Sequence, residues 1–289
     1  MDDSSGIVAV AGQKSDNFIF YAGVWGDRTY FVSLEDNMVM RLTSIGFMGS
    51  VAVDNSREKV SIMPRDGGEL YTATRGDGWT INSLGLKIPS SNSCVGVLTY
   101  AEDDRYVYAM SDDGLYEVDL TDKSYTKLVT PSDYPAFNGV NLGQWEHYLT
   151  YSKYDKCFFA SYPENNGILK IWKDTSGAWQ VERYAGFQPG WLNTTFGDRL
   201  TDAVLKQPCG MAVNSYGELY VCCKASHCIV KIKGRLVSLV AGVPDRSGRL
   251  NGFPTDAMFD NPVDIALDSE ENFFICERSS NAIRKMTIE

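Results

Sequence analysis

TDAVLKQPCGMAVNSYGELYVCCKASHCIVKIK, residues 201–233, aligns without a gap with TDAMFDNPVDIALDSEENFFICERSSNAIRKMT, residues 255–287. The offset is constant, since 255 − 201 = 54, and it relates Pro208 to Pro262. A gapless repeat of this length indicates that one supersecondary unit is built twice.

Each copy consists of short apolar runs separated by turn-forming residues. The runs of the first copy, rich in β-branched and aromatic side chains, are residues 208–213, 218–222, 229–232 and 236–240. Short runs of this composition between turn formers predict strands. Four antiparallel strands in a repeat of about 40–50 residues are typical of one blade of a β-propeller. The repeat therefore predicts two consecutive blades.

The two copies resemble NHL repeats, whose pattern runs A-x-F-x-x-P-x-G-I-A-V-D-x-x-G-x-L-Y-V-A-D-x-x-N-H-x-I-R-K-I. The first copy matches this pattern at Ala203, Pro208, Gly210, Ala212, Val213, Gly217, Leu219, Tyr220, Val221, His227, Ile229, Lys231 and Ile232. It departs from the pattern at Cys223 and Ser226, and the second copy departs at Glu277 and Ser280.

The resemblance covers residues 186–289, about a third of the chain, and is faint before them. The chain resembles the NHL-repeat proteins of Bacteroidetes-type bacteria, in which the propeller is often paired with an IPT/TIG domain. That likeness implies an extracytoplasmic location, at the cell surface or in the periplasm. The sequence itself contains no lipobox and no IPT/TIG domain, and its acidic start, Met1–Ser5, is unlike a signal peptide.

The rest of the chain contains further strand-like runs, which we divide into four blades. Their expected strands are residues 18–23, 30–34, 38–42 and 47–53; 59–63, 69–74, 79–82 and a short piece near Leu86; 94–100, 106–110, 115–120 and 125–129; and 146–151, 157–161, 168–172 and 179–184. Residues 50–54 could instead begin the second of these blades as its first strand. The sequence thus predicts one all-β domain over residues 1–289, a six-bladed β-propeller (NHL/TolB-like) with four-stranded antiparallel blades. Five or seven blades are the alternatives.

The ends of the chain suggest how such a ring would close. Residues 6–12 end in Ala-Gly, as do the expected fourth strands 183–186 and 236–242. The last repeat stops after its third strand, residues 282–288. We therefore expect the N-terminal strand to complete the C-terminal blade, which would leave no exposed sheet edge.

Composition narrows the range of partners. A net charge of −10 over 289 residues, with no basic cluster, argues against a nucleic-acid partner. No apolar run approaches the roughly 20 residues of a membrane-spanning helix, so no membrane span is expected. We expect a monomer that binds a glycan or a protein and carries no cofactor.

Seven cysteines without disulfide-framework spacing include Cys222, Cys223 and Cys228, which together with His227 would suggest zinc. Two arguments favour structural thiols instead. Adjacent residues of a strand point to opposite faces, so Cys222 and Cys223 do not readily share a metal. The aligned strands also hold a small residue at the position of Cys222, namely Ser33, Ala73, Ala109, Ala160, Cys222 and Cys276.

Three long connections, residues 131–144, 187–207 and 243–261, should lie on one face of the propeller, where long loops commonly carry function. Aromatic and cationic side chains there suit a sugar, because aromatic rings stack on sugar C–H faces and polar groups bind hydroxyls. The candidate ligand-binding residues are Tyr134, Phe137, Trp145, Trp191, Phe196, Arg199 and Arg246. We expect a non-catalytic module for a glycan or oligosaccharide, with a protein–protein scaffold as the alternative.

A metal-dependent hydrolase or lyase is the third possibility. The chain has only two histidines, His147 and His227, and no nucleophile motif or phosphate loop. Weak candidates for a metal site near the central channel are Glu146 and Asp264. No catalytic residue is predicted.

Overall fold

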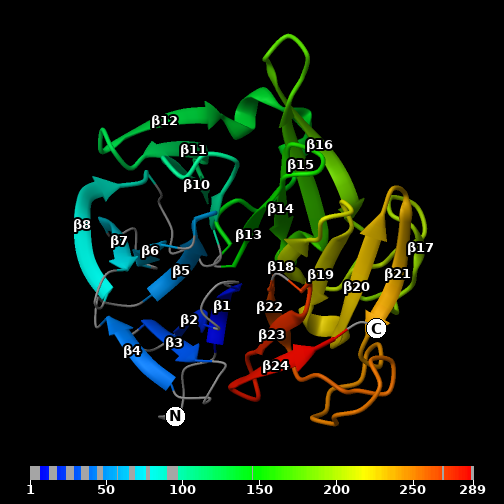
Figure 1. Cartoon of the computed structure of the whole chain (residues 1–289). Helices are drawn as coiled ribbons and strands as arrows, with labels where there is room; N and C mark the ends of the chain where they lie inside the picture. Colours follow the sequence, from blue (N-terminus) through cyan, green and yellow to red (C-terminus); the bar gives the residue numbers. More distant parts are fainter. Residues whose placement is uncertain are drawn as a thin grey trace.

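The computed structural model describes residues 7–12, 18–23, 29–33, 39–43, 48–56, 58–64, 69–75, 79–89, 97–144, 146–268 and 270–287. In the four ranges before residue 48 it describes the backbone alone. The described strands form six antiparallel sheets arranged around a central axis (Figure 1). The predicted all-β propeller is confirmed.

The strands follow the chain from sheet to sheet. The first sheet contains β1 (Ile7–Gly12), β2 (Phe18–Gly23), β3 (Thr29–Ser33) and β4 (Val39–Thr43), and the second contains β5 (Met48–Val53), β6 (Lys59–Pro64), β7 (Glu69–Arg75) and β8 (Trp79–Lys87). The third contains β9 (Leu98–Tyr100), β10 (Tyr106–Ser111), β11 (Gly114–Asp119) and β12 (Ser124–Val129), and the fourth β13 (Tyr148–Ser152), β14 (Cys157–Tyr162), β15 (Gly167–Lys173) and β16 (Trp179–Gly186). The fifth contains β17 (Gly197–Asp198), β18 (Pro208–Val213), β19 (Leu219–Cys223), β20 (Cys228–Lys233) and β21 (Leu236–Ala241), and the sixth β22 (Pro262–Leu267), β23 (Phe273–Glu277) and β24 (Ala282–Met286).

The first strands of the six sheets surround the central channel. β1, β5, β9, β13, β18 and β22 contact one another in this order, and β22 returns to β1. Two serines link neighbouring sheets near the axis: Ser50 accepts a hydrogen bond from the Leu98 amide at 3.0 Å, and Ser161 donates one to the Cys209 carbonyl at 2.7 Å. The sheets are therefore joined by polar bonds at the centre as well as by apolar packing.

Apolar side chains fill the space between adjacent sheets. Tyr108 on β10 packs against Phe158 on β14, with ring centroids 4.8 Å apart, and Tyr220 on β19 packs against Phe273 on β23 at 4.5 Å. All four rings lie on second strands, and Phe158, Tyr220 and Phe273 are buried. Alternation along a strand places successive side chains against the two neighbouring sheets, which explains why these strands are apolar at nearly every position.

The prediction of six complete four-stranded blades is wrong. Five sheets have the four antiparallel strands of a blade, one of them extended by β17, but the sheet of β22, β23 and β24 has three described strands. The predicted closing strand is also wrong, because β1 pairs with β2 in its own sheet, and the described strands of the last sheet pair only with one another.

The Ala-Gly ending of residues 6–12 did not identify a fourth strand, because first strands and fourth strands have similar apolar patterns. Once β1 is the first strand of its sheet, Met48–Val53 becomes the first strand of the second sheet, as the alternative assignment proposed. Ser33 and Ala73 then lie on third strands, whereas Ala109, Ala160, Cys222 and Cys276 share the second-strand position.

Cysteine placement supports a structural role for the thiols. Cys222 packs in the apolar cluster that contains Tyr220 and Phe273, whereas Cys223 packs in the cluster on the opposite face, with Phe159. The predicted divergence of the two side chains is confirmed. Cys94 lies outside the described residues. Among the described residues, no helix is long and apolar enough to cross a bilayer.

We predict that the thiols react only after unfolding. Six cysteines are free and buried, and burial raises the pKa of Cys157 to about 12, so little reactive thiolate forms near pH 8. Mass spectrometry should find these six almost unlabelled after native alkylation, and all seven labelled in denaturant without reductant. A missing label in denaturant, or stoichiometric zinc in the native protein, would contradict this prediction.

Candidate functional site

The three long connections lie at one end of the blades. Each joins the last strand of one sheet to the first strand of the next: Val129 to Tyr148, Gly186 to Pro208, and Ala241 to Pro262. In an antiparallel four-stranded blade these connections all leave from the same end, which we call the loop face. The turns between second and third strands, such as η4 (Lys224–Ser226), lie at the same end.

The first connection is packed against the protein. It contains η1 (Pro131–Asp133) and η2 (Pro135–Phe137). The Tyr134 hydroxyl between them donates a hydrogen bond to the Trp179 carbonyl at 3.2 Å. Phe137 is only 5% exposed and meets Tyr162 edge to face. These two predicted ligand residues therefore present little free aromatic surface.

The second connection contains both packed and exposed candidates. Phe196 is half-buried against the apolar core, and the Arg199 guanidinium lies over the Tyr184 ring at 4.1 Å. In contrast, the indole of Trp191 is 82% exposed. Of the predicted aromatic residues that the structure describes, Trp191 alone offers a free ring face to solvent; Trp145 lies outside the described residues.

One carboxylate ties the second connection to the third. Asp245 accepts hydrogen bonds from the Thr194 amide at 3.1 Å, the Thr194 hydroxyl at 2.9 Å and the Lys206 ammonium at 2.8 Å. Burial raises the pKa of Asp245, but the bonds from Lys206 and Thr194 outweigh it and hold the pKa below its ordinary value. The carboxylate is therefore ionised at neutral pH. Exposed Arg246 follows Asp245 directly, so these bonds hold the segments that carry Arg246 and Trp191 against each other.

A second cluster lies where the channel opens on the loop face. The Lys224 ammonium donates to one oxygen of Glu146 at 2.5 Å, and the Arg278 guanidinium donates to the other. Lys224 follows β19, Arg278 follows β23, and Glu146 precedes β13 by two residues. The two cations occupy equivalent repeat positions, since 278 − 224 = 54. Three sheets thus contribute one residue each to a compact ionic triad.

Polar groups continue from this triad into the channel. A cavity of about 260 Å³ is lined by first strands, including Tyr148 on β13 and Asp264 on β22. The Tyr148 hydroxyl is buried and has no hydrogen-bond partner in the described part of the chain. Burial raises its pKa well above the ordinary value, and the charges of Glu146 and Asp264 raise it further. The hydroxyl is therefore protonated at neutral pH.

The contacts of Glu146 disfavour a metal there, because both of its oxygens are bonded to cations. In the described ranges, no group of three His, Cys, Asp or Glu side chains has the arrangement of a metal site. His147 is buried, donates a hydrogen bond from Nε2 to the Met110 carbonyl at 3.2 Å, and stacks on Tyr162. His227 accepts a hydrogen bond from the Asn261 amide and so joins the fifth sheet to the following loop.

Sequence reasoning missed Lys224, Arg278 and Tyr148. A signal for the first two was present, because the 54-residue offset places a basic residue directly after both second strands. Their common partner Glu146 is 78 residues from one and 132 from the other, so only the ring geometry brings the three together.

Comparisons with known proteins support the fold. No protein-family model matches the chain, and no curated protein matches it. A structural genomics protein of unknown function from Bacteroides thetaiotaomicron is similar, with a TM-score of 0.81 at 22% identity over 98% of this chain and 70% of its own. An auxiliary nutrient binding protein from the same organism has a TM-score of 0.78 at 19% identity. The match covers 98% of this chain and 69% of that protein.

A more distant likeness is to a catalytically inactive virginiamycin B lyase from Staphylococcus aureus with quinupristin. Its TM-score is 0.61 at 13% identity, over 99% of this chain and 83% of the lyase. Likenesses at these identities show the fold alone. The NHL resemblance and the pairing with an IPT/TIG domain stay predictions.

We predict that Gly210→Ala destabilises the channel wall. A Cβ at Gly210 would lie 1.9 Å from Asp264 Oδ1 and 2.5 Å from the Asp264 Cα, so the backbone of β18 or β22 must move. The free energy of unfolding should fall by about 2 kcal/mol in urea titrations. Gly252→Ala is the matched control, because its nearest atom is 3.9 Å away; equal stability of the two variants would contradict the prediction.

We also predict that Glu146→Gln weakens the protein, because it leaves two partly buried cations without their carboxylate. The expected loss is about 2 kcal/mol of unfolding free energy. Glu102→Gln is the control: Glu102 forms an exposed ion pair with Lys156 at 3.8 Å and should change stability by less than about 0.5 kcal/mol. If both variants unfold at the wild-type urea midpoint, the triad has no structural role.

Proposed function

We propose that this propeller is a non-catalytic binding module, and that its ligand is an oligosaccharide bound on the loop face. The observation that carries the proposal is Trp191, an 82% exposed indole on a loop that is anchored rather than free. An exposed tryptophan held in place is a suitable platform for the C–H face of a sugar ring.

Polar side chains around the indole suit the rest of a sugar. Asn193 and Arg246 are exposed, and the Thr194–Asp245 bonds hold their two segments together. Amide and guanidinium groups donate hydrogen bonds to hydroxyls, whereas the ring supplies apolar contact. The anchoring limits the entropy lost when a ligand orders the loop.

The other predicted residues contribute less in this proposal. Tyr134, Phe137, Phe196 and Arg199 support the loops through packing. Both oxygens of Glu146 are bonded to cations of the ionic triad, which argues against a role for this carboxylate as a catalytic base. The similar Bacteroides protein described as an auxiliary nutrient binding protein supports a binding role and, with it, an extracytoplasmic location.

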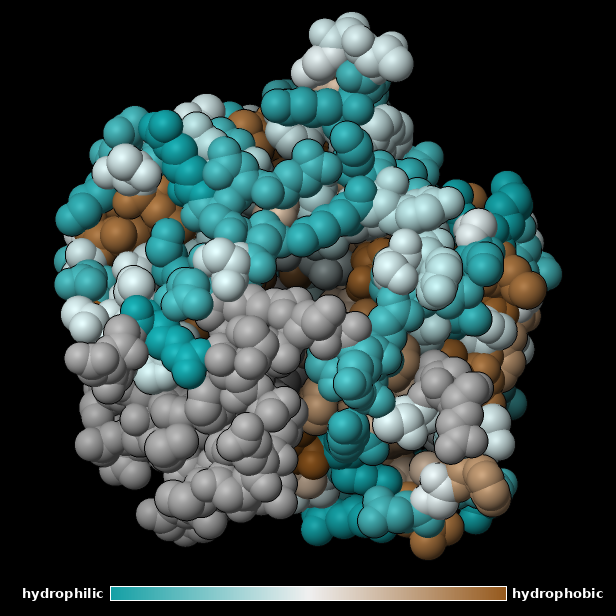
Figure 2. Space-filling view, viewed as in Figure 1, coloured by the Kyte–Doolittle hydropathy of each residue, from teal (hydrophilic) through white to brown (hydrophobic). Residues whose placement is uncertain are grey.

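A protein-binding scaffold is the second candidate. Leu250 and Phe253, in the third connection, are 55% and 80% exposed. In Figure 2, hydrophobic surface gathers over the segment that Figure 1 colours orange, which contains this connection. Exposed apolar side chains of this kind mark protein interfaces.

We predict that glycan binding, measured on a broad glycan array and then by calorimetry, depends on Trp191. Trp191→Ala should weaken binding at least about tenfold, since loss of an aromatic platform costs on the order of 1–2 kcal/mol. Tyr216→Ala is the matched control, because Tyr216 is 70% exposed but lies in the turn at the opposite end of β18.

Absence of any glycan bound by the wild-type protein, or equal losses in both variants, would overturn the oligosaccharide proposal. Binding of a protein ligand that requires Phe253 but not Trp191 would favour the scaffold instead.

A further inference from the structure

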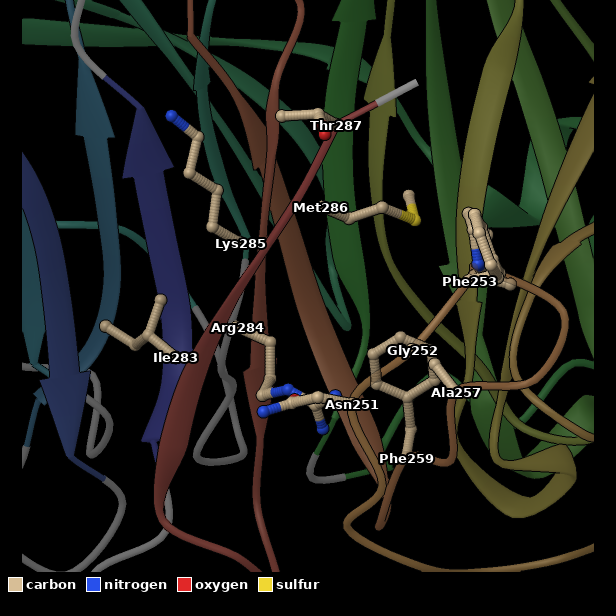
Figure 3. A pocket seen from close by; sticks show the side chains of 12 residues that line it. Asn251, Gly252, Phe253, Ala257, Phe259, Ile283, Arg284, Lys285, Met286 and Thr287 are labelled. Atoms are coloured by element: carbon tan, nitrogen blue, oxygen red, sulfur yellow. The ribbon is translucent and has the colours of Figure 1, made fainter. Parts of the chain in front are cut away.

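Two hollows in the described part of the chain differ in their chemistry. The larger, of about 990 Å³, lies beside β24, and Figure 3 shows its lining, with Phe253 of the exposed apolar surface at one side. Its cation Arg284 is bonded to Glu277. The smaller is the channel cavity of about 260 Å³, lined by the first strands β5, β9, β13, β18 and β22. The ionic triad and Tyr148 make the channel the hollow that suits a small polar ligand.

The two cations of the triad keep unused hydrogen-bond donors. A lysine ammonium has three N–H donors, and an arginine guanidinium has five. In the described part of the chain, the side chains of Lys224 and Arg278 are bonded to Glu146 alone. Both of the Glu146 oxygens are already occupied, so the remaining donors call for an acceptor from outside the triad.

The triad also carries a net positive charge, because two cations share one carboxylate. Burial lowers the pKa of Lys224, but its interactions with Cys209 and Glu146 outweigh burial and raise the pKa, so the ammonium is charged at neutral pH. The side chain of Lys224 is 16% exposed and that of Arg278 33%, so both are partly shielded and still within reach of a solute. In a protein of net charge −10, this is a local site for one negative charge.

A buried hydroxyl lies beside these charges. Tyr148 lines the cavity, is 2% exposed, and its hydroxyl has no hydrogen-bond partner in the described residues. Burial has the largest effect on the pKa of this hydroxyl, but Glu146 and Arg278 act on it too, which places it close to the triad. A hydroxyl buried without a partner is costly, and a ligand oxygen that accepts its hydrogen bond removes that cost.

We propose that the loop-face end of the channel binds a small hydroxy monocarboxylate. Its carboxylate accepts hydrogen bonds from the unused donors of Arg278 and Lys224, and one of its hydroxyls accepts the hydrogen bond of Tyr148. The planar fork of a guanidinium matches the geometry of a carboxylate. One negative charge matches the net charge of the triad, whereas a dianion would be repelled by Glu146 and Asp264.

The volume of the cavity limits the size of the ligand. A cavity of 260 Å³ has the liquid volume of about nine water molecules, so a hydroxy acid of a few carbon atoms fits and an oligosaccharide does not. The channel site is therefore separate from the surface around Trp191, and it does not depend on the oligosaccharide proposal.

Calorimetric titration of the intact protein with lactate and glycerate at neutral pH tests the proposal. Both should bind. Their neutral counterparts propylene glycol and glycerol, in which a CH₂OH group replaces the carboxylate, should bind at least about tenfold more weakly, because they lose the charged bonds to two cations.

Two variants test the residues. Tyr148→Phe should weaken glycerate binding about fivefold, because one hydrogen bond is lost, and should leave the urea midpoint unchanged, because the hydroxyl has no partner in the described fold. Arg278→Gln should weaken it at least about tenfold. Tyr125→Phe and Arg105→Gln are the matched controls, because Tyr125 is 43% exposed and Arg105 forms exposed ion pairs in the third sheet; both should bind glycerate as the wild type does.

The proposal would be overturned if neither hydroxy acid binds, or if each binds no better than its neutral counterpart. Full affinity for glycerate in Tyr148→Phe or in Arg278→Gln would also overturn it. Inorganic phosphate is the last probe: phosphate binding as tight as that of glycerate, and unaffected by Tyr148→Phe, would show general attraction of anions and not a hydroxy-acid site.

Discussion

Contact between β1 and β22 closes the ring of sheets, and the positions of the loops and the channel follow from that closure. These strands belong to different sheets, and among the described residues no backbone hydrogen-bond ladder joins the two. The other neighbouring sheets are joined by side-chain packing between their faces and by polar bonds near the axis. Since the ring is complete only when the first and last sheets meet, loss of this contact would open the ring between them.

The ring also explains the ionic triad. A closed ring of antiparallel blades brings second-strand ends and first-strand beginnings together around the channel mouth. Lys224 and Arg278 would repel each other there, and the carboxylate of Glu146 from a third sheet lies between them and attracts both. Because Glu146 bonds with one oxygen to each cation, the triad joins the fourth, fifth and sixth sheets where the channel wall is polar.

The long connections are likewise held by contacts between segments that are distant in the sequence. A long connection loses conformational entropy when it is ordered, and several hydrogen bonds must offset that loss. Asp245 supplies three of them to Thr194 and Lys206, and it fixes two connections with one carboxylate. The first connection is ordered by burial of Phe137 and by the hydrogen bond from the Tyr134 hydroxyl to the Trp179 carbonyl. Exposure of Trp191 on an anchored loop is therefore unlike the exposure of a free loop tip.

The amino-acid sequence by itself determined the strands, the repeat and the propeller, because turn residues and apolar periodicity are local signals. It also determined that Cys222 and Cys223 face opposite ways, since alternation along a strand is a property of the backbone. Tertiary structure alone decided that β1 is the first strand of its own sheet, because similar apolar runs serve as first or fourth strands. It alone joined Glu146 to Lys224 and Arg278 and separated exposed Trp191 from buried Phe137, since contacts between distant segments depend on how the ring closes.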